Sequence, residues 1–231
     1  MNRRQFTQRG AALGILGSAG LSVWPGPALA SLAEADAVSG VRAALERGAQ
    51  SAVKLLGRND GFLGNPKVRI PLPGFLEDAA RLLKATGQQR KVDELVTAMN
   101  RAAEAAVPQA QALLVQAARS ISIEDALRIV RGSQTSVTDF FARKTREPLT
   151  QKFMPIVTQA TAKVSLAEKY NAVAAKAAKL GLLKAQDADI NRHVTAKSLD
   201  GLYLMIGEEE QRIRHDPVGT GSAILKKVFG R

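Results

Sequence analysis

Polar side chains gather in a stretch of the sequence that is dense in glycine, proline and asparagine, from Gly57 to Pro73. Within it, Asp60, Asn65 and Arg69 supply a carboxylate, an amide and a guanidinium. On an ordered loop these groups can present both a negative and a positive charge to a ligand. They also have a structural interpretation, because Asp60 and Asn65 stand beside a glycine and a proline and are common turn formers.

Two more polar groups fall in segments that have the apolar spacing of helices. The first contains Asn100, Arg101 and Glu104, and the second contains Asp139, Arg143 and Lys144. Each group occupies one to two helical turns, and it is a candidate either for a ligand site or for a polar network that joins two helices. The candidate ligand-binding residues are Asp60, Asn65, Arg69, Asn100, Arg101, Glu104 and Asp139.

A carboxylate and an arginine together can support a hydrolase or lyase reaction, with Asp60 or Glu104 as general base and Arg69 or Arg101 as anion clamp. The motifs of familiar catalysts are missing, however. The chain has no cysteine, its two histidines are 22 residues apart, and it contains neither a phosphate-binding loop nor a nucleophile elbow. We therefore predict no catalytic residue, no metal site and no cofactor, and we rank an enzyme last among the functional hypotheses.

The positive charge is concentrated in one part of the chain. The formal net charge is +12, and residues 140–184 contain nine basic and two acidic side chains. A candidate surface for an anionic partner therefore comprises Arg143, Lys144, Lys169 and Lys176. The two later lysines flank an alanine-rich stripe, as in helices on anionic membranes, although such a stripe also suits packing against the domain. Nucleic acid is disfavoured as a partner, because the basic residues are not interleaved with aromatic ones.

The N-terminus has the order of features typical of a secretory signal peptide. Arg3, Arg4 and Arg9 precede an apolar run of about 15 residues, which ends in a small-x-small cleavage motif at Ala28 to Ala30. That run contains four glycines and is too short to span a membrane as a helix. The first two arginines also fit a twin-arginine motif. We expect a leader over residues 1–30 and a periplasmic or secreted mature chain, residues 31–231, that has no transmembrane segment.

The rest of the sequence must supply elements that hold these side chains. The 231 residues are 45% hydrophobic and only 4% aromatic, and apolar residues recur at three- and four-residue spacing in long alanine-rich windows. This pattern predicts an all-α, single-domain irregular bundle of about seven to nine helices, with one long ordered loop at 57–74. The predicted helices span residues 32–56, 76–85, 92–118, 122–132 with Ser122 as its cap, 136–146, 149–164, 166–180, 188–214 with a break inside it, and 222–229. The apolar spacing predicts one stripe on the first helix, at Val38, Val41, Leu45, Ala49, Ala52, Val53 and Leu56.

A run of three acids, Glu208, Glu209 and Glu210, stands near the end of the helix expected at 188–214. Arg212 and Arg214 follow four residues after the first and the third acid, in the acid-first order that favours ion pairs on a helix. We interpret this run as a solvated helical face and not as a carboxylate site.

Several blocks of the sequence resemble one known family. They are DGFLGNP at 60–66, RIPLP at 69–73, MNRAAE at 99–104, TDFF at 138–141, KT at 144–145, PIV at 155–157, AKSLDGL at 196–202, EEE at 208–210 and LKKVFG at 225–230. In this order, from about Asp36 to Gly230, they are similar to the domain-of-unknown-function 4197 family of exported bacterial proteins. The resemblance implies a helical domain of the bacterial envelope or periplasm with no established activity.

Three functional hypotheses follow. The first is a binding or interaction module, which would engage an anionic envelope component or a protein partner through the loop and the basic segment. The second is a carrier that holds an apolar ligand between its helices, where many alanines and few aromatic residues leave room. The third is the hydrolase or lyase.

Overall fold

The computed structural model describes residues 27–130, 136–179 and 189–230, and these residues fold into α-helices without any strand. The helices are α1 (Pro27–Leu56), α2 (Glu77–Ala85), α3 (Gln89–Arg119), α4 (Ile123–Val130), α5 (Ser136–Lys163), α6 (Leu166–Lys179), α7 (Ile190–His215) and α8 (Ala223–Phe229). A single 3₁₀ turn, η1 (Gly74–Leu76), precedes α2. The predicted all-α class is therefore confirmed. The predicted leader lies outside the described residues, except for its last four, which begin α1.

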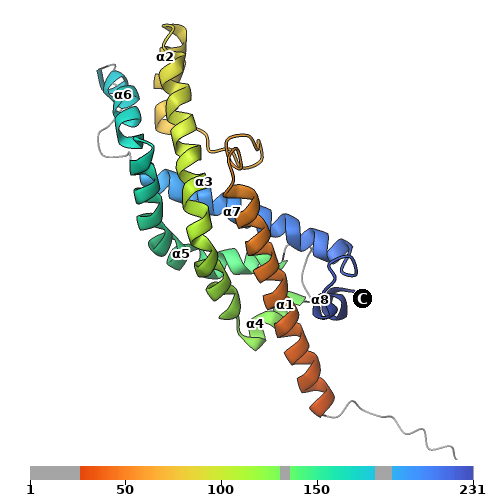
Figure 1. The fold of residues 1–231 in the computed structure, drawn as a ribbon. Helices are drawn as coiled ribbons and strands as arrows, with labels where there is room; N and C mark the ends of the chain where they lie inside the picture. Colours follow the sequence, from red (N-terminus) through yellow and green to blue (C-terminus); the bar gives the residue numbers. More distant parts are fainter. Residues whose placement is uncertain (1–26, 131–135, 180–188, 231) are drawn as a thin grey trace, which may run out of the picture.

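Four long helices, α1, α3, α5 and α7, form the body of the molecule (Figure 1). α1 packs against both α3 and α7, and α5 packs against the same two helices from the other side. The shorter helices cover the ends: α2 and α6 lie against α3, whereas α4 and α8 lie against α1. The irregular segment between α1 and η1 leaves the C-terminal end of α1 and loops out beside α3 (Figure 1), and its residues contact both α3 and α7.

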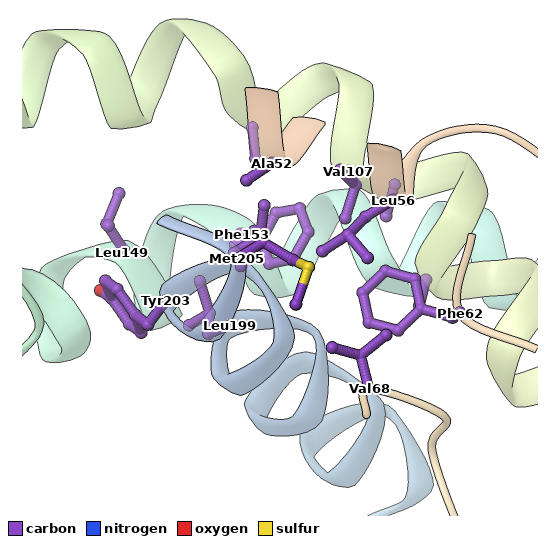
Figure 2. Packing of buried hydrophobic residues seen from close by; sticks show 14 of the residues in the cluster. Ala52, Leu56, Phe62, Val68, Val107, Leu149, Phe153, Leu199, Tyr203 and Met205 are labelled. Carbon is purple, nitrogen blue, oxygen red and sulfur yellow. The ribbon is translucent and has the colours of Figure 1, made fainter. Parts of the chain in front are cut away.

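The core consists of side chains from all of these elements. The apolar stripe that the spacing predicts on the first helix is buried at each position, namely Val38, Val41, Leu45, Ala49, Ala52, Val53 and Leu56. Figure 2 shows Phe62 and Val68 of the loop packed into this core beside Leu56 and Met205. The loop thus contributes core residues of its own, which explains how 17 residues without a helix or strand keep a defined course.

Two of the predicted helix boundaries are wrong. The helices expected at 136–146 and 149–164 are one continuous helix, α5, which contains Pro148 and Pro155. A proline removes one backbone hydrogen bond, but Leu149 and Phe153, which lie between the two prolines, are buried in the core, and their packing holds the helix together. The break expected within 188–214 is also absent, because α7 runs without interruption through Gly201 and Gly207.

None of the helices in the described ranges combines the length and the apolar character needed to cross a membrane.

Candidate functional site

Two side chains of α3 hold the loop between α1 and η1. Glu104 is 5% exposed, and its Oε1 accepts hydrogen bonds from the backbone N–H groups of Phe62 and Leu63, both at 3.0 Å. Asn100 is fully buried; its Oδ1 accepts from the N–H of Ile70 at 2.8 Å and its Nδ2 donates to the Ile70 carbonyl at 3.0 Å. Buried backbone N–H and C=O groups need hydrogen-bond partners. Here, side chains on one face of α3 supply these partners to a loop that forms no β-sheet.

Arg101 extends this network to the surface. Its guanidinium donates to Glu104 Oε2 at 2.6 Å and to Asp60 Oδ1 at 2.8 Å. The hydrogen bond with Glu104 is the largest cause of the raised pKa of Arg101, and the bond to Asp60 adds to it. Asp60 itself has a left-handed backbone, with φ of 60°, at the turn that starts the loop.

Three of the predicted ligand-binding residues, Asp60, Arg101 and Glu104, therefore bind one another. Glu104 and a fourth, Asn100, bind the loop backbone. Asn65 lies further along the loop, where its Oδ1 accepts from the N–H of Lys67 at 3.1 Å and closes a turn. Arg69 is exposed on the same loop. These contacts support the interpretation of the polar residues as turn formers and as a network that joins elements.

The opposite side of the loop rests on α7. Phe62 is fully buried against Gly201, where an added Cβ would lie 2.8 Å from the ring atom Cε1. Lys67 forms a 2.6 Å ion pair with Glu208, and His193 Nε2 is 3.0 Å from the carbonyl oxygen of Pro71. Burial lowers the pKa of His193, so the neutral ring donates its Nε2–H to that carbonyl. The loop is thus clamped between α3 and α7.

The acidic run on α7 is not a solvated face, and that prediction is wrong for two of its three residues. Glu210 is 3% exposed and accepts from the N–H groups of Val137 and Thr138 at 3.2 and 2.8 Å, so it caps the start of α5. The pair of Glu210 with Arg214 that the spacing predicts does form, at 3.0 Å. Glu209 is buried as well and binds an arginine of α1, Arg47, at 3.1 Å.

Asp139 does not join the loop network. It lines a groove between α5 and α7, of about 330 Å³, together with Arg146 and Tyr203. Arg146 is engaged there, because it forms a 2.7 Å ion pair with Asp200 and its guanidinium lies 5.1 Å from the centre of the Tyr203 ring. Arg143 lies beside Asp139 and Arg146 at an adjoining hollow of the same α5 face.

A larger hollow of about 410 Å³, which we call the α3–α4–α5 cleft, opens on a different side of α5. Its apolar lining residues are Leu113, Ala117, Ile121, Phe140, Phe141, Pro148 and Leu149. Its polar lining residues are Gln116, Ser120, Asp125, Lys144, Thr145 and Lys152. Apolar side chains of α3, of α5 and of the turn before α4 therefore line an open space instead of closing on one another.

The elements around the α3–α4–α5 cleft are fixed by capping and buried contacts. Ser122 Oγ accepts from the N–H of Asp125 at 3.2 Å, which confirms the cap predicted for this helix start. Arg42 of α1 donates to the carbonyl of Ile121 at 2.6 Å and so holds the turn between α3 and α4. The Glu210 cap fixes the first turn of α5, next to Phe140 and Phe141.

Two lysines stand at the α3–α4–α5 cleft without a polar partner. Lys144 and Lys152 are both exposed, and neither makes an ion pair or a hydrogen bond with any described residue. The ammonium group of Lys144 instead lies 5.6 Å from the centre of an aromatic ring of the cleft itself, that of Phe140. This site thus combines an apolar lining with uncompensated positive charge.

The four residues predicted as an anionic-partner surface do not share one face. Lys144 lies at the α3–α4–α5 cleft, Arg143 at the hollow beside the α5–α7 groove, and Lys169 at a cleft between α3 and α6. The side chain of Lys176 lies outside the described residues. The four-residue set leaves out Lys152, which is one of the nine basic side chains of 140–184. Its four-residue spacing from Pro148, and that of Pro148 from Lys144, is typical of a shared helix stripe.

Comparison with known protein families finds a match. A family model described as "Protein of unknown function (DUF4197)" matches residues 31–230, nearly the whole chain. A search of curated proteins and a search of solved structures find no significant match. Within the described residues, no group of three or more histidine, aspartate or glutamate side chains is placed to hold a metal ion.

Proposed function

The chain belongs to the DUF4197 family, and because the function of that family is unknown, we propose one from the geometry: it is a binding module that takes the apolar part of a ligand into the α3–α4–α5 cleft. The proposed module works outside the cytosol, in the periplasm or beyond, after export through a twin-arginine leader. The support for export is the basic and apolar order of residues 1–30 and a family match that starts at residue 31.

The binding proposal rests on one observation, the apolar lining of the α3–α4–α5 cleft. Ligand sites of proteins are mostly apolar hollows of about 300–1,000 Å³, and this one, at about 410 Å³, falls within that range. A buried apolar cavity of only about 150 Å³ suffices to bind benzene. A cleft lined by seven apolar residues therefore has room for an alkyl chain or a ring system.

An enzymatic role for the loop carboxylates has less support. Both oxygens of Glu104 already accept hydrogen bonds, from two backbone N–H groups and from Arg101. A general base must also come within hydrogen-bond reach of the substrate proton, and Glu104 is only 5% exposed. The carboxylate of Asp60 is likewise bound to Arg101. We therefore place the binding activity in the α3–α4–α5 cleft and not at the loop.

The test is to titrate the purified mature chain with 1-octanol, 1-decanol and 1-dodecanol, which share a neutral end group and differ only in chain length. Each added methylene buried in the cleft should strengthen binding by about 0.8 kcal/mol, or roughly fourfold in Kd. Titration calorimetry measures these affinities directly, and mass spectrometry of gently purified protein shows any ligand that has co-purified.

A cleft-filling variant gives the matched control. Ala117→Leu adds three carbons at a lining position of α3 and should weaken 1-dodecanol binding by about tenfold or more. Ala105→Leu makes the same change at an exposed position of the same helix and should leave the affinity unaltered. Affinities that do not depend on chain length, or that are equal in the two variants, would contradict the proposed function.

A further inference from the structure

We propose that the ligand is a single-chain amphiphile with an anionic end group, and that Lys144 and Lys152 bind this group at the mouth of the α3–α4–α5 cleft. The inference rests on the proposed function, because it presumes that the apolar part of the ligand occupies the cleft. It adds the chemical class of the ligand and names the two side chains that select it.

The first argument is the charge balance at the α3–α4–α5 cleft. Two ammonium groups and one carboxylate, that of Asp125, line it, and no ion pair joins them. A positive charge that stands over an apolar cleft without a partner favours a ligand that carries the opposite charge at one end. A neutral ligand would leave this charge uncompensated, and a cationic one would be repelled.

The second argument is a contrast with the other cations that line hollows of this molecule. Arg146, at the α5–α7 groove, is paired with Asp200 at 2.7 Å. Arg101, at the cleft between α3 and α6, is paired with Glu104 at 2.6 Å. Among the described residues, these hollows keep at most one cation each without an ion pair, namely Lys169 between α3 and α6 and Arg143 beside the α5–α7 groove. The α3–α4–α5 cleft has two, Lys144 and Lys152.

The third argument is that both lysine side chains can reach the same anion. Lys144 and Lys152 are eight residues apart on α5, so their backbones are separated by about 12 Å along the helix axis. Pro148 lies midway between them and also lines the cleft. A lysine stem can lie along apolar surface while its ammonium group remains in water, so both side chains can approach an anion near Pro148. An alkyl chain bound to that anion would then extend over Phe140, Phe141 and Leu149.

The experiment compares probes that share a dodecyl chain and differ in the end group: dodecanoate, dodecyl phosphate, 1-dodecanol and dodecyltrimethylammonium, each below its micelle concentration. Dodecanoate and dodecyl phosphate should bind about tenfold more tightly than 1-dodecanol, and the cationic probe should bind most weakly. The advantage of the anionic probes should shrink as salt rises from 50 to 500 mM, because salt screens exposed charges. Acetate and inorganic phosphate, which have no chain, should fail to displace dodecanoate.

Charge-removing variants assign the effect to the two lysines. The double variant Lys144→Met and Lys152→Met keeps an unbranched apolar stem at each position, and it should reduce the ratio of dodecanoate to 1-dodecanol affinity to about one. Lys163→Met removes an exposed lysine of the same helix that does not line the α3–α4–α5 cleft, and it should keep the ratio of the unaltered protein.

Each outcome decides between the two proposals. Equal affinity for the anionic and neutral probes in the unaltered protein overturns this inference and leaves the proposed function intact. An anionic preference that survives in the double variant overturns the assignment to Lys144 and Lys152. Displacement of dodecanoate by inorganic phosphate alone indicates an anion site without a chain and also overturns it. Failure of every dodecyl probe to bind, 1-dodecanol included, overturns the proposed function itself.

Discussion

The loop at 57–73 and the α3–α4–α5 cleft use polar side chains in opposite ways. Around the loop, Asn100 and Glu104 bind the backbone of the same chain, and Arg101 binds two of its carboxylates. At the cleft, Lys144 and Lys152 bind no polar group of the described residues. A cluster of residues that could bind a ligand or act as an acid or base is therefore not by itself a functional site. A polar side chain is available to a ligand only where the fold has not already used it.

Removal of the Glu104 carboxylate is the strongest test of whether the polar side chains around the loop have a structural role. Glu104→Ala leaves the buried N–H groups of Phe62 and Leu63 and the guanidinium of Arg101 without their acceptor. We expect a loss of about 3 kcal/mol in the free energy of unfolding, because each buried unpaired donor costs about 1–3 kcal/mol. Urea unfolding followed by circular dichroism measures this loss.

The control for this variant is Glu147→Ala, at an exposed position of α5 where the carboxylate accepts a hydrogen bond from the exposed Gln151. It should change stability by less than about 0.5 kcal/mol. A similarly small effect in Glu104→Ala would show that the buried network does not hold the loop. The loop carboxylates would then again be candidates for a ligand site.

The sequence predicted the fold better than the site. The stripe on α1 follows from apolar spacing alone, because a helix that covers a core must bury one face. The polar blocks in the loop and on α3 were found as well, yet their role depends on which atoms meet across 30 to 42 residues of chain. Local spacing carries no information on such contacts.

The errors have the same origin. Glu209 and Glu210 have the spacing of a solvated face, but their burial is decided by α1 and α5, which are distant in sequence. Pro148 is a plausible helix end by local rules, and the packing of Leu149 and Phe153 overrides it. The α3–α4–α5 cleft could not be predicted, because it depends on the spaces that three packed helices leave between them.

A second pair of substitutions tests how firmly α7 holds the loop in place. A Cβ at Gly201 would lie 2.8 Å from Cε1 of the fully buried Phe62 ring, whereas a Cβ at Gly207 would meet Thr138 Cγ2 at 3.6 Å, an ordinary contact. Both glycines are inside α7, where alanine is favoured over glycine by up to about 1 kcal/mol. Gly207→Ala should therefore stabilise the protein by several tenths of a kcal/mol.

Gly201→Ala should instead destabilise it by about 1 kcal/mol, because the cost of overpacking, about 1–3 kcal/mol, exceeds the gain in helix propensity. Thermal unfolding of the two variants side by side gives the difference with the same helix and the same chemical change. If both variants gain stability, then the Phe62 ring can move away from α7, and the loop is less firmly held than the structure indicates.

The smallest expected effect concerns the contact of the loop with His193. Burial lowers the pKa of this half-buried ring below its ordinary value of 6.5, despite the opposing contact with the Pro71 carbonyl, and the charge of Lys197 lowers it further. As pH falls through 6.5, the unfolded chain therefore takes up a proton before the folded protein does. The contribution of His193 to stability is complete above that pH, and it declines as pH falls toward the lower pKa of the folded state.

Urea unfolding at pH 7.5 and pH 5.5 measures this contribution when the unaltered protein is compared with His193→Gln. The comparison cancels the effect of the carboxylates, which also titrate in acid and are present in both proteins. The stability difference between the two proteins should shift in favour of the variant at pH 5.5. His215→Gln makes the same substitution at an exposed position of the same helix and serves as the matched variant. If the shift for His193 has the opposite sign, the charged ring is the better donor to the Pro71 carbonyl. This edge of the loop would then resemble the α3–α4–α5 cleft, as a place where positive charge remains exposed to solvent.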